Sequence, residues 1–452
     1  MASTNISKAY ASSGTRTKWT WSFWLKRGTI TNGDQVVSTC HLDNNNQDVV
    51  RFGASDDKLD WWSYQAGSYS NGGRLQTNRV FRDCNGWYHI VLRWDSSNST
   101  AGDRMKMWIN GVEETSFATD TNPTSGRESL FNFGNNSQTW KIGSGNNTQY
   151  FDGSLSHIHF CDNQLYQASD FGSFDSTTGE WKINTTPSVS YGTNGFFILK
   201  NGNSLTDESP NSNNWSSGNG TLTKTEDCPS NIFCTLNPIN TRYISILQGN
   251  NTASGGNNGS DYSYIGSTLA ANSGKFYWEV KAADLAEIDQ VGVARASSNF
   301  SNVSTGHGLQ GTPYGGKSVQ FSNGNKAGDD AQSAYMGGFS TDDIMMIALD
   351  LDNNKITFGR NGQWANGSGG ADQTYANSTA AFTNLTAGEY YMPAHAMRGY
   401  GGNTGISRYN FGNGYFATTA ISSAGTNASN IGLFEYDVPS GFTALSTKGL
   451  NE

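Results

Sequence analysis

Alternating aromatic side chains are the feature of this sequence that most restricts its fold. Near the N-terminus, Trp19, Trp21, Phe23 and Leu25 are separated by single residues, of which only Trp24 is apolar. Because successive side chains of a β-strand point to opposite faces, this spacing predicts a strand with one face in a hydrophobic core. Trp24 then lies on the opposite face of the same strand.

The same alternation recurs along the chain and is punctuated by turn signals. Further examples lie at residues 88–94, 105–109, 276–280 and 356–358. Asn110-Gly111 and Asn361-Gly362 follow two of these segments, and Asn-Gly readily adopts the two positive φ angles of a type I′ hairpin turn. Helical spacing is hardly present. Many short strands separated by turns predict an all-β protein made of antiparallel β-sandwiches.

Length and composition indicate two domains. A chain of 452 residues exceeds one usual domain, and its 13 tryptophans suffice for two cores. Pro210, Pro229 and Pro238 interrupt strand pairing within a polar stretch. We therefore expect domains at residues 1–206 and 246–420, a linker at 207–245 and a short C-terminal tail at 421–452.

Charge and hydropathy exclude several classes of partner. The formal net charge is -9 at pH 7 and basic runs are absent, so we expect no nucleic-acid partner and no membrane partner. The N-terminus lacks the apolar segment of a signal peptide, so we expect the protein to be made in the host cytoplasm and not to be exported by that route. The five cysteines include no CxxC pair, which predicts reduced thiols rather than disulfides or a zinc site.

Patterns that resemble catalytic or metal sites are incomplete. Glu287-Ile288-Asp289 begins a glucanase-like Glu-x-Asp-x-x-Glu pattern, but residue 292 is glycine, so the second carboxylate is absent. Residues 350–354 resemble the start of a calcium-binding EF-hand loop without its later glycine and glutamate, which favours a turn. His157 and His159 alternate along a strand near Cys161, which leaves a zinc site as an alternative to an ordinary sheet face. We expect no enzyme activity, no cofactor and no bound metal.

Aromatic and basic residues in polar segments are the candidate binding residues. The first group is Trp61, Trp62 and Tyr64, because a flat apolar ring edged by polar groups suits a sugar or a protein partner. The two tryptophans must point to opposite faces of a strand. The outward one either contacts a ligand or is covered by a loop or a neighbouring subunit. The second group, Arg398, Tyr400 and Arg408, lies among glycines that suit contact loops.

Two segments resemble known domain families. Residues 16–200 resemble a laminin-G-like, concanavalin A-like jelly roll, on the motifs GWYHIVLRWD at 86–95 and MWINGV at 107–112. Residues 273–416 resemble a SPRY domain, on SGKFYWEV at 273–280 and IALDLDNNKITF at 347–358. The resemblance implies a jelly roll followed by a SPRY-like sandwich, with the partner-binding loops of the latter at one end.

The connecting stretches are similar to virion proteins of tailed bacteriophages that join these two folds. They lie at residues 151–153, 170–175, 179–181, 191–196, 233–238 and 439–445. The resemblance implies a non-enzymatic virion protein, expected to be a tail-fibre or receptor-binding adhesin. Alternatives are a capsid decoration or head-fibre protein and, more distantly, a polysaccharide-degrading enzyme. The expected partners are other virion proteins of the tail or capsid, a host surface glycan or protein, and further copies of the chain in a homo-oligomer.

Overall fold

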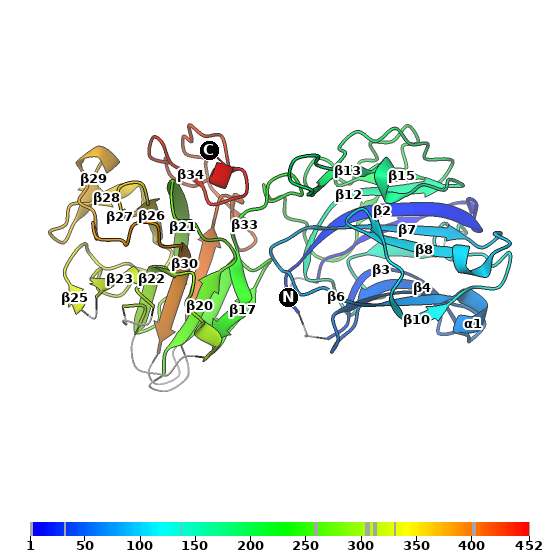
Figure 1. Cartoon of the computed structure of the whole chain (residues 1–452), viewed down its shortest axis with the longest axis horizontal. Coiled ribbons are helices and arrows are strands. Elements are labelled where there is room, and N and C mark those ends of the chain that lie inside the picture. The colour runs from blue at the N-terminus through cyan, green and yellow to red at the C-terminus, as the bar shows by residue number, and fades with distance from the viewer. Residues whose placement is uncertain are drawn as a thin grey trace. The chain divides into compact units, whose positions relative to one another are not determined.

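A computed structural model describes residues 3–30, 33–136, 138–256, 261–302, 308–310, 314–329, 331–399 and 404–451. The chain divides into two compact units, Met1–Lys224 and Thr225–Glu452, called here the first and second domains (Figure 1). Each is an antiparallel β-sandwich, as the alternation of apolar residues predicted. No helix in the described part of the chain is long and apolar enough to cross a bilayer.

The first domain packs two antiparallel sheets against each other. The larger sheet has the spatial order β10 (Phe117–Thr121), β6 (Arg74–Val80), β5 (Lys58–Tyr64), β4 (Asn46–Phe52), β3 (Gln35–Asp43), β11 (Thr139–Ile142), β1 (Ile6–Ala9) and β16 (Ser216–Ser217). The smaller sheet has the order β15 (Phe196–Ile198), β12 (Gly153–Asp162), β2 (Lys18–Arg27), β7 (Tyr88–Asp95), β8 (Met105–Ile109) and β9 (Val112–Glu113). A hairpin of β13 (Gly172–Phe174) and β14 (Trp181–Ile183) lies outside both.

Strand β2 carries the residues that the alternation placed in the core. Trp19, Trp21, Phe23 and Leu25 are fully buried between the two sheets. The prediction of one core-facing side is therefore confirmed. Trp24 lies on the other face, as expected, but it is buried too.

A long connection covers that outer face of the smaller sheet. The segment between β12 and β15 packs Tyr166, Phe171, Trp181 and Tyr191 over the sheet in a separate hydrophobic cluster. A hydrogen bond also holds this connection on the sheet. The hydroxyl of Thr20 on β2 donates to the carbonyl of Gln164 at 2.9 Å. Strand β2 is therefore buried on both faces rather than half-buried.

The predicted Asn-Gly hairpins are confirmed. Asn110 and Gly111 have φ angles of 47° and 83° between β8 and β9. Asn361 and Gly362 have φ angles of 49° and 85° between β27 (Lys355–Arg360) and β28 (Gln363–Ala365). Positive φ at both central residues is the geometry of a type I′ turn, which matches the twist of the flanking strands.

The second domain is also a sandwich of two sheets. One has the order β17 (Leu236–Arg242), β20 (Ser263–Ser267), β30 (Tyr391–Arg398), β22 (Ile288–Arg295), β23 (Lys317–Gln320), β24 (Lys326–Gly328) and β25 (Ala331–Ser333). The other has the order β18 (Ile244–Leu247), β19 (Thr252–Gly255), β31 (Gly405–Asn410), β21 (Lys275–Asp284), β26 (Ile344–Asp350), β27, β28 and β29 (Ala371–Gln373), and β34 (Thr443–Ala444) pairs with β21. A small hairpin joins β32 (Tyr415–Phe416) to β33 (Thr419–Ala420).

Within the residues that the structure describes, helical structure is confined to single turns. These are α1 (Tyr69–Gly72), η1 (Ala101–Asp103), η2 (Ala168–Asp170), η3 (Phe300–Asn302), η4 (Tyr375–Asn377) and η5 (Gly449–Asn451). Their shortness agrees with the near absence of helical spacing in the sequence.

The domain division differs from the expected linker at 207–245. Residues up to Lys224 belong to the first domain, where Trp215 is buried in the core and β16 pairs with β1. From Phe233 onward the chain is packed into the second domain. The prolines marked the end of regular strand pairing, but isolated aromatic side chains still anchor these irregular segments.

The expected C-terminal tail at 421–452 is likewise part of the second domain. Phe434, Val438 and Phe442 pack with Tyr277 on the outer face of β21. Strand β34 pairs in parallel with the start of β21, which adds backbone hydrogen bonds. The attachment of this segment depends on a few apolar side chains that are spaced irregularly, so no periodic pattern in the sequence marks it.

Candidate functional site

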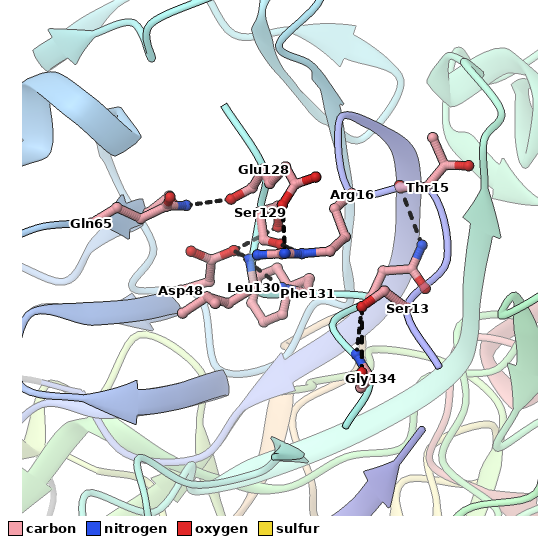
Figure 2. Close-up of polar contacts among 12 residues, drawn as sticks. Ser13, Thr15, Arg16, Asp48, Gln65, Glu128, Ser129, Leu130, Phe131 and Gly134 are labelled. Carbon is pink, nitrogen blue, oxygen red and sulfur yellow. Dashed lines mark hydrogen bonds and ion pairs between the residues drawn. The ribbon is translucent and has the colours of Figure 1, made fainter. Parts of the chain in front are cut away.

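A polar pocket lies at one end of the first sandwich. It has a volume of about 330 Å³ and is lined by Arg16, Gln65 and residues 124–128. Arg16 lies just before β2, Gln65 directly follows β5, and residues 124–128 belong to the connection between β10 and β11. Figure 2 shows the side chains of Arg16 and Gln65 reaching toward Glu128. The pocket therefore joins three segments that are far apart in the sequence.

The wall formed by residues 123–129 is held in place by hydrogen bonds to surrounding loops. The bonds are Arg104 Nη1 to the Pro123 carbonyl at 2.9 Å, Gly126 N to the Ser96 carbonyl at 2.8 Å, Arg127 Nε to the Asn71 carbonyl at 3.1 Å and Ser129 N to the Arg16 carbonyl at 2.9 Å. Backbone and side chain are thus both fixed before any ligand arrives. A wall ordered in advance reduces the entropy lost on binding.

Asp48 supports this wall from the core side. Its Oδ2 accepts hydrogen bonds from the Ser129 hydroxyl at 2.6 Å, from Leu130 N at 2.6 Å and from Phe131 N at 3.1 Å (Figure 2). Burial raises the pKa of Asp48, whereas these donors and the Ser63 hydroxyl lower it. The carboxylate therefore supplies acceptors for backbone N–H groups that have no strand partner.

Arg16 is the most firmly held cation of the pocket. Its Nε donates to the Ser129 carbonyl at 2.7 Å, and its guanidinium carbon lies 4.6 Å from the ring centre of Phe133. Its Nη1 forms an ion pair with Glu128 Oε2 at 2.6 Å. Gln65, which is buried, donates through Nε2 to the carbonyl of Glu128 at 2.6 Å and to the Ser63 hydroxyl at 2.7 Å. The pocket thus offers donors and acceptors at set positions.

We expect Ser129→Ala to lower the free energy of unfolding of the first domain by about 1 to 2 kcal/mol, because buried Asp48 loses a donor. Urea unfolding followed by tryptophan fluorescence measures this change. Ser125→Ala, an exposed serine of the same wall, is the matched control and should change stability by less than about 0.5 kcal/mol. Equal effects of the two substitutions would contradict the role of Asp48 in holding the wall.

The predicted tryptophan pair splits between the two faces of β5. Trp61 is in the core, with its ring centre 5.8 Å from that of Trp19. Trp62 lies on the outer face of the larger sheet, where only 7% of it is exposed. The guanidinium groups of Arg51 and Arg74 lie 4.7 and 5.9 Å from its ring centre. The outward tryptophan is therefore covered by neighbours within its own domain, which leaves little ring surface for a ligand.

Tyr64 lies beside Trp62 and is partly exposed. Its ring centre is 4.7 Å from that of Tyr69 on α1, and Tyr69 is 36% exposed. Arg74 pairs with the buried Asp60 through both Nε and Nη2, at 2.9 and 2.8 Å, and holds this arrangement rigid. Of the predicted aromatic group, Tyr64 retains the most accessible surface, and its ligand role remains a prediction.

The second predicted group is not brought together. Arg398 ends β30, and its guanidinium lies 5.0 Å from the ring centre of Tyr262. Arg408 lies on β31, which belongs to the opposite sheet of the sandwich. Tyr400 falls outside the described residues. A shared site for these residues therefore remains a prediction.

The histidines considered for zinc are parts of a packed face. His157 lies at a β-bulge with a φ of 46° and contacts the hydroxyl of Ser156 through Nδ1 at 2.7 Å. His159 contacts Tyr191, and its ring stacks on Phe197 with centres 3.9 Å apart. The part of the chain that the structure describes contains no cluster of three or more potential metal ligands. These contacts favour the alternative of an ordinary, covered sheet face.

The two other sequence patterns also have structural roles. Asp289 is buried in the core of the second domain and bonds to His395, which in turn contacts the Tyr409 hydroxyl at 2.8 Å. Asp350 ends β26 and accepts hydrogen bonds from Asn353 N at 3.1 Å and from its side chain. The latter arrangement is the strand-ending turn that the sequence favoured.

The pocket residues were missed at the sequence level. Arg16, Gln65 and Glu128 are polar residues of irregular segments, so no periodicity marks them. Their proximity arises only when the sandwich closes. A weak signal existed in the cluster of turn-forming residues at 122–126, which separates two strands.

Comparison with known proteins supports the fold of the first domain. Residues 3–169 match a laminin G-type family model of the concanavalin A-like lectin/glucanases superfamily. The first domain has the concanavalin A-like fold. No curated protein sequence matches the chain.

Several solved structures are similar to parts of the chain. The SPRY domain of human HERC1 is 17% identical with a TM-score of 0.30, over 38% of this chain and 96% of that domain. The TRIM65 PSpry domain is 14% identical with a TM-score of 0.28, over 39% of this chain and 91% of that structure. The heptameric SAP-like pentraxin of Limulus polyphemus is 17% identical with a TM-score of 0.30, over 48% of this chain and 89% of the pentraxin chain.

Proposed function

We propose that this protein is a non-enzymatic adhesin of a tailed-bacteriophage particle, located on the tail or its fibres and binding the host surface through the first domain. The observation that carries the binding function is the polar pocket, whose wall is fixed by hydrogen bonds before a ligand arrives. The assignment to a phage particle rests on the connecting stretches of the sequence, such as residues 151–153 and 233–238.

The arrangement of carboxylates supports a binding rather than a catalytic role. A glycosidase needs two carboxylates that flank one glycosidic bond. Within the pocket lining, Glu128 is the single carboxylate, and it is paired with Arg16. Asp289, from the glucanase-like pattern, lies inside the core of the other domain.

Location on the particle tests the proposal first. Immunogold electron microscopy with antibody against this chain should label the tail or its fibres. Purified protein should then bind cells of the phage host and compete with adsorption of the phage. Label over the head would instead support the alternative of a capsid decoration or head-fibre protein. Particles without label would overturn the virion assignment, and failure of folded protein to bind cells would overturn adhesion.

A further inference from the structure

We propose that the pocket binds an acidic sugar through its carboxylate, and that Glu128 competes with this ligand for Arg16. The inference rests on the binding function proposed above and names the ligand class of the same site. Its elements are two guanidinium groups, one exposed carboxylate and a lining of hydroxyl, amide and backbone groups.

The charges that line the pocket favour an anion. They are Arg16, Arg127 and Glu128, so positive charge exceeds negative charge there. The whole chain has a formal net charge of -9, which makes this local excess a departure from the average surface. Glu128 neutralises one of the two cations, and the other has no carboxylate partner among the described residues.

Arg127 presents its guanidinium in a fixed orientation. Its Nε donates to the Asn71 carbonyl at 3.1 Å, and the backbone N–H of Arg127 donates to the Thr124 carbonyl at 3.2 Å. Its terminal Nη atoms bond to none of the residues that the structure describes. A planar guanidinium whose two terminal NH₂ groups are available matches the two oxygens of a carboxylate.

Arg16 is the second cation of the pocket, and Glu128 of the same pocket is already paired with it. Its side chain is 16% exposed, whereas that of its partner Glu128 is 60% exposed. Nε of Arg16 and the ring of Phe133 hold the guanidinium, while Glu128 approaches from the solvent side. An ion pair whose carboxylate is largely exposed to solvent is weak, so an incoming carboxylate can replace Glu128 at little cost.

The rest of the lining favours a sugar over an acidic peptide. Thr124 and Ser125 expose hydroxyl groups, Gly126 exposes backbone, and Gln65 contributes an amide. An apolar peptide side chain would find no apolar wall, whereas sugar hydroxyls can exchange hydrogen bonds with the exposed hydroxyl and backbone groups. The volume of about 330 Å³ lies at the lower end of small-molecule sites, which suits one sugar residue of a chain.

Calorimetric titration of the full chain tests the proposal. The probes are the methyl glycosides of glucuronate, galacturonate and N-acetylneuraminate, each paired with its neutral methyl ester. We expect at least one acid to bind, and its ester to bind at least tenfold more weakly because charge-assisted hydrogen bonds are lost. Added salt should lower the affinity for the acid and leave the affinity for the ester unchanged. Absence of binding by all three acids, equal binding of acid and ester, or stronger binding of triglutamate would each overturn the proposal.

Two variants separate the roles of the charged residues. Arg127→Gln should lower the affinity for the acidic sugar by about 10- to 100-fold. Glu128→Gln should raise this affinity by up to about fivefold, because the carboxylate that competes for Arg16 is removed. Unchanged affinity in Arg127→Gln, with tryptophan fluorescence like that of the wild type, would place the ligand elsewhere and overturn the site.

Cell binding distinguishes this inference from the adhesin proposal. If the wild-type chain attaches to host cells but binds no acidic sugar, adhesion stands and the ligand class is wrong. If acidic sugars bind but the chain neither attaches to cells nor labels the particle, the ligand class stands and the adhesin proposal is wrong.

Discussion

Acidification from pH 7 to pH 4.5 is expected to lower the free energy of unfolding of the first domain by about 2.5 kcal/mol through His89 alone. Burial lowers the pKa of His89 from 6.5 to about 3. The stabilisation due to this group is full above pH 6.5 and is lost as the pH falls toward 3, because the unfolded chain takes up the proton first. His157, with a pKa lowered by burial to about 4, acts in the same direction.

The surroundings of His89 explain why its charged form is excluded. The indole N–H of Trp181 donates to Nδ1 at 3.0 Å, so the ring proton of the neutral form lies on Nε2, which faces the Ser22 hydroxyl at 2.8 Å. Protonated Nδ1 would face another donor. The ring is also stacked on Trp24, with ring centres 4.8 Å apart, while Trp181 lies beside it with its ring centre 5.9 Å away. Protonation would therefore weaken the contact that holds the β13–β14 hairpin over the sheet.

Differential scanning calorimetry at the two pH values measures the effect, and tryptophan fluorescence assigns the transition. Eleven of the 13 tryptophans precede residue 225, so fluorescence reports mainly on the first domain. A loss of about 2.5 kcal/mol corresponds to a fall of roughly 5 to 10 °C in the midpoint for a domain of this size. His89→Gln should remove that part of the pH dependence, whereas His41→Gln, at a partly exposed position, should not. Equal pH dependence in both variants would show that His89 is not the titrating group.

The fold of this chain was accessible from sequence because its strands carry local signals. The spacing of two at Trp19, Trp21 and Phe23 and the Asn-Gly turn at 110–111 depend only on neighbouring residues. The structure differed from the prediction in the expected linker and C-terminal tail. There, a few contacts between residues distant in sequence decide to which domain a segment belongs. Trp215 belongs to the first core and Phe434 to the second domain, although neither lies in an alternating segment.

The candidate site could be predicted less well, for a related physical reason. Trp62 was correctly separated from Trp61, but its coverage by Arg51 and Arg74 depends on the register between neighbouring strands. Arg16 and Glu128 pair across 112 positions of the sequence. Side chains of loops gain their partners only when the sandwich closes, so composition and periodicity carry little information about them.

The second domain should respond to pH in the opposite sense, because of Glu279. This residue is fully buried on β21, and its carboxylate holds the C-terminal segment by accepting hydrogen bonds from Glu435 N at 2.9 Å and Tyr436 N at 2.8 Å. The Tyr277 hydroxyl and the Asn410 amide are two further donors, at 2.9 and 3.2 Å. Burial outweighs these donors and raises the pKa of Glu279 from 4.5 to about 7.

The sign follows from which state holds the proton. Between pH 4.5 and 7 the folded domain retains a proton on Glu279 that the unfolded chain has released, so stability falls as the pH rises. From pH 5 to pH 8 the loss should be about 2.5 kcal/mol, or roughly 5 to 10 °C in the calorimetric midpoint of the second domain. The two transitions of one chain should therefore move in opposite directions as the pH changes.

Glu279→Gln tests this role directly. The variant should lose the pH dependence due to this group, because an amide does not titrate in this range. At pH 5 it should also be less stable than the wild type by about 1 to 3 kcal/mol, since the amide NH₂ must face the backbone N–H of Glu435 or Tyr436, neither of which can rotate away. Glu287→Gln, at an exposed position before β22, is the matched control and should change little. A Glu279→Gln domain that keeps the pH dependence of the wild type would show that another group titrates, and that the buried carboxylate does not set the pH response of the C-terminal segment.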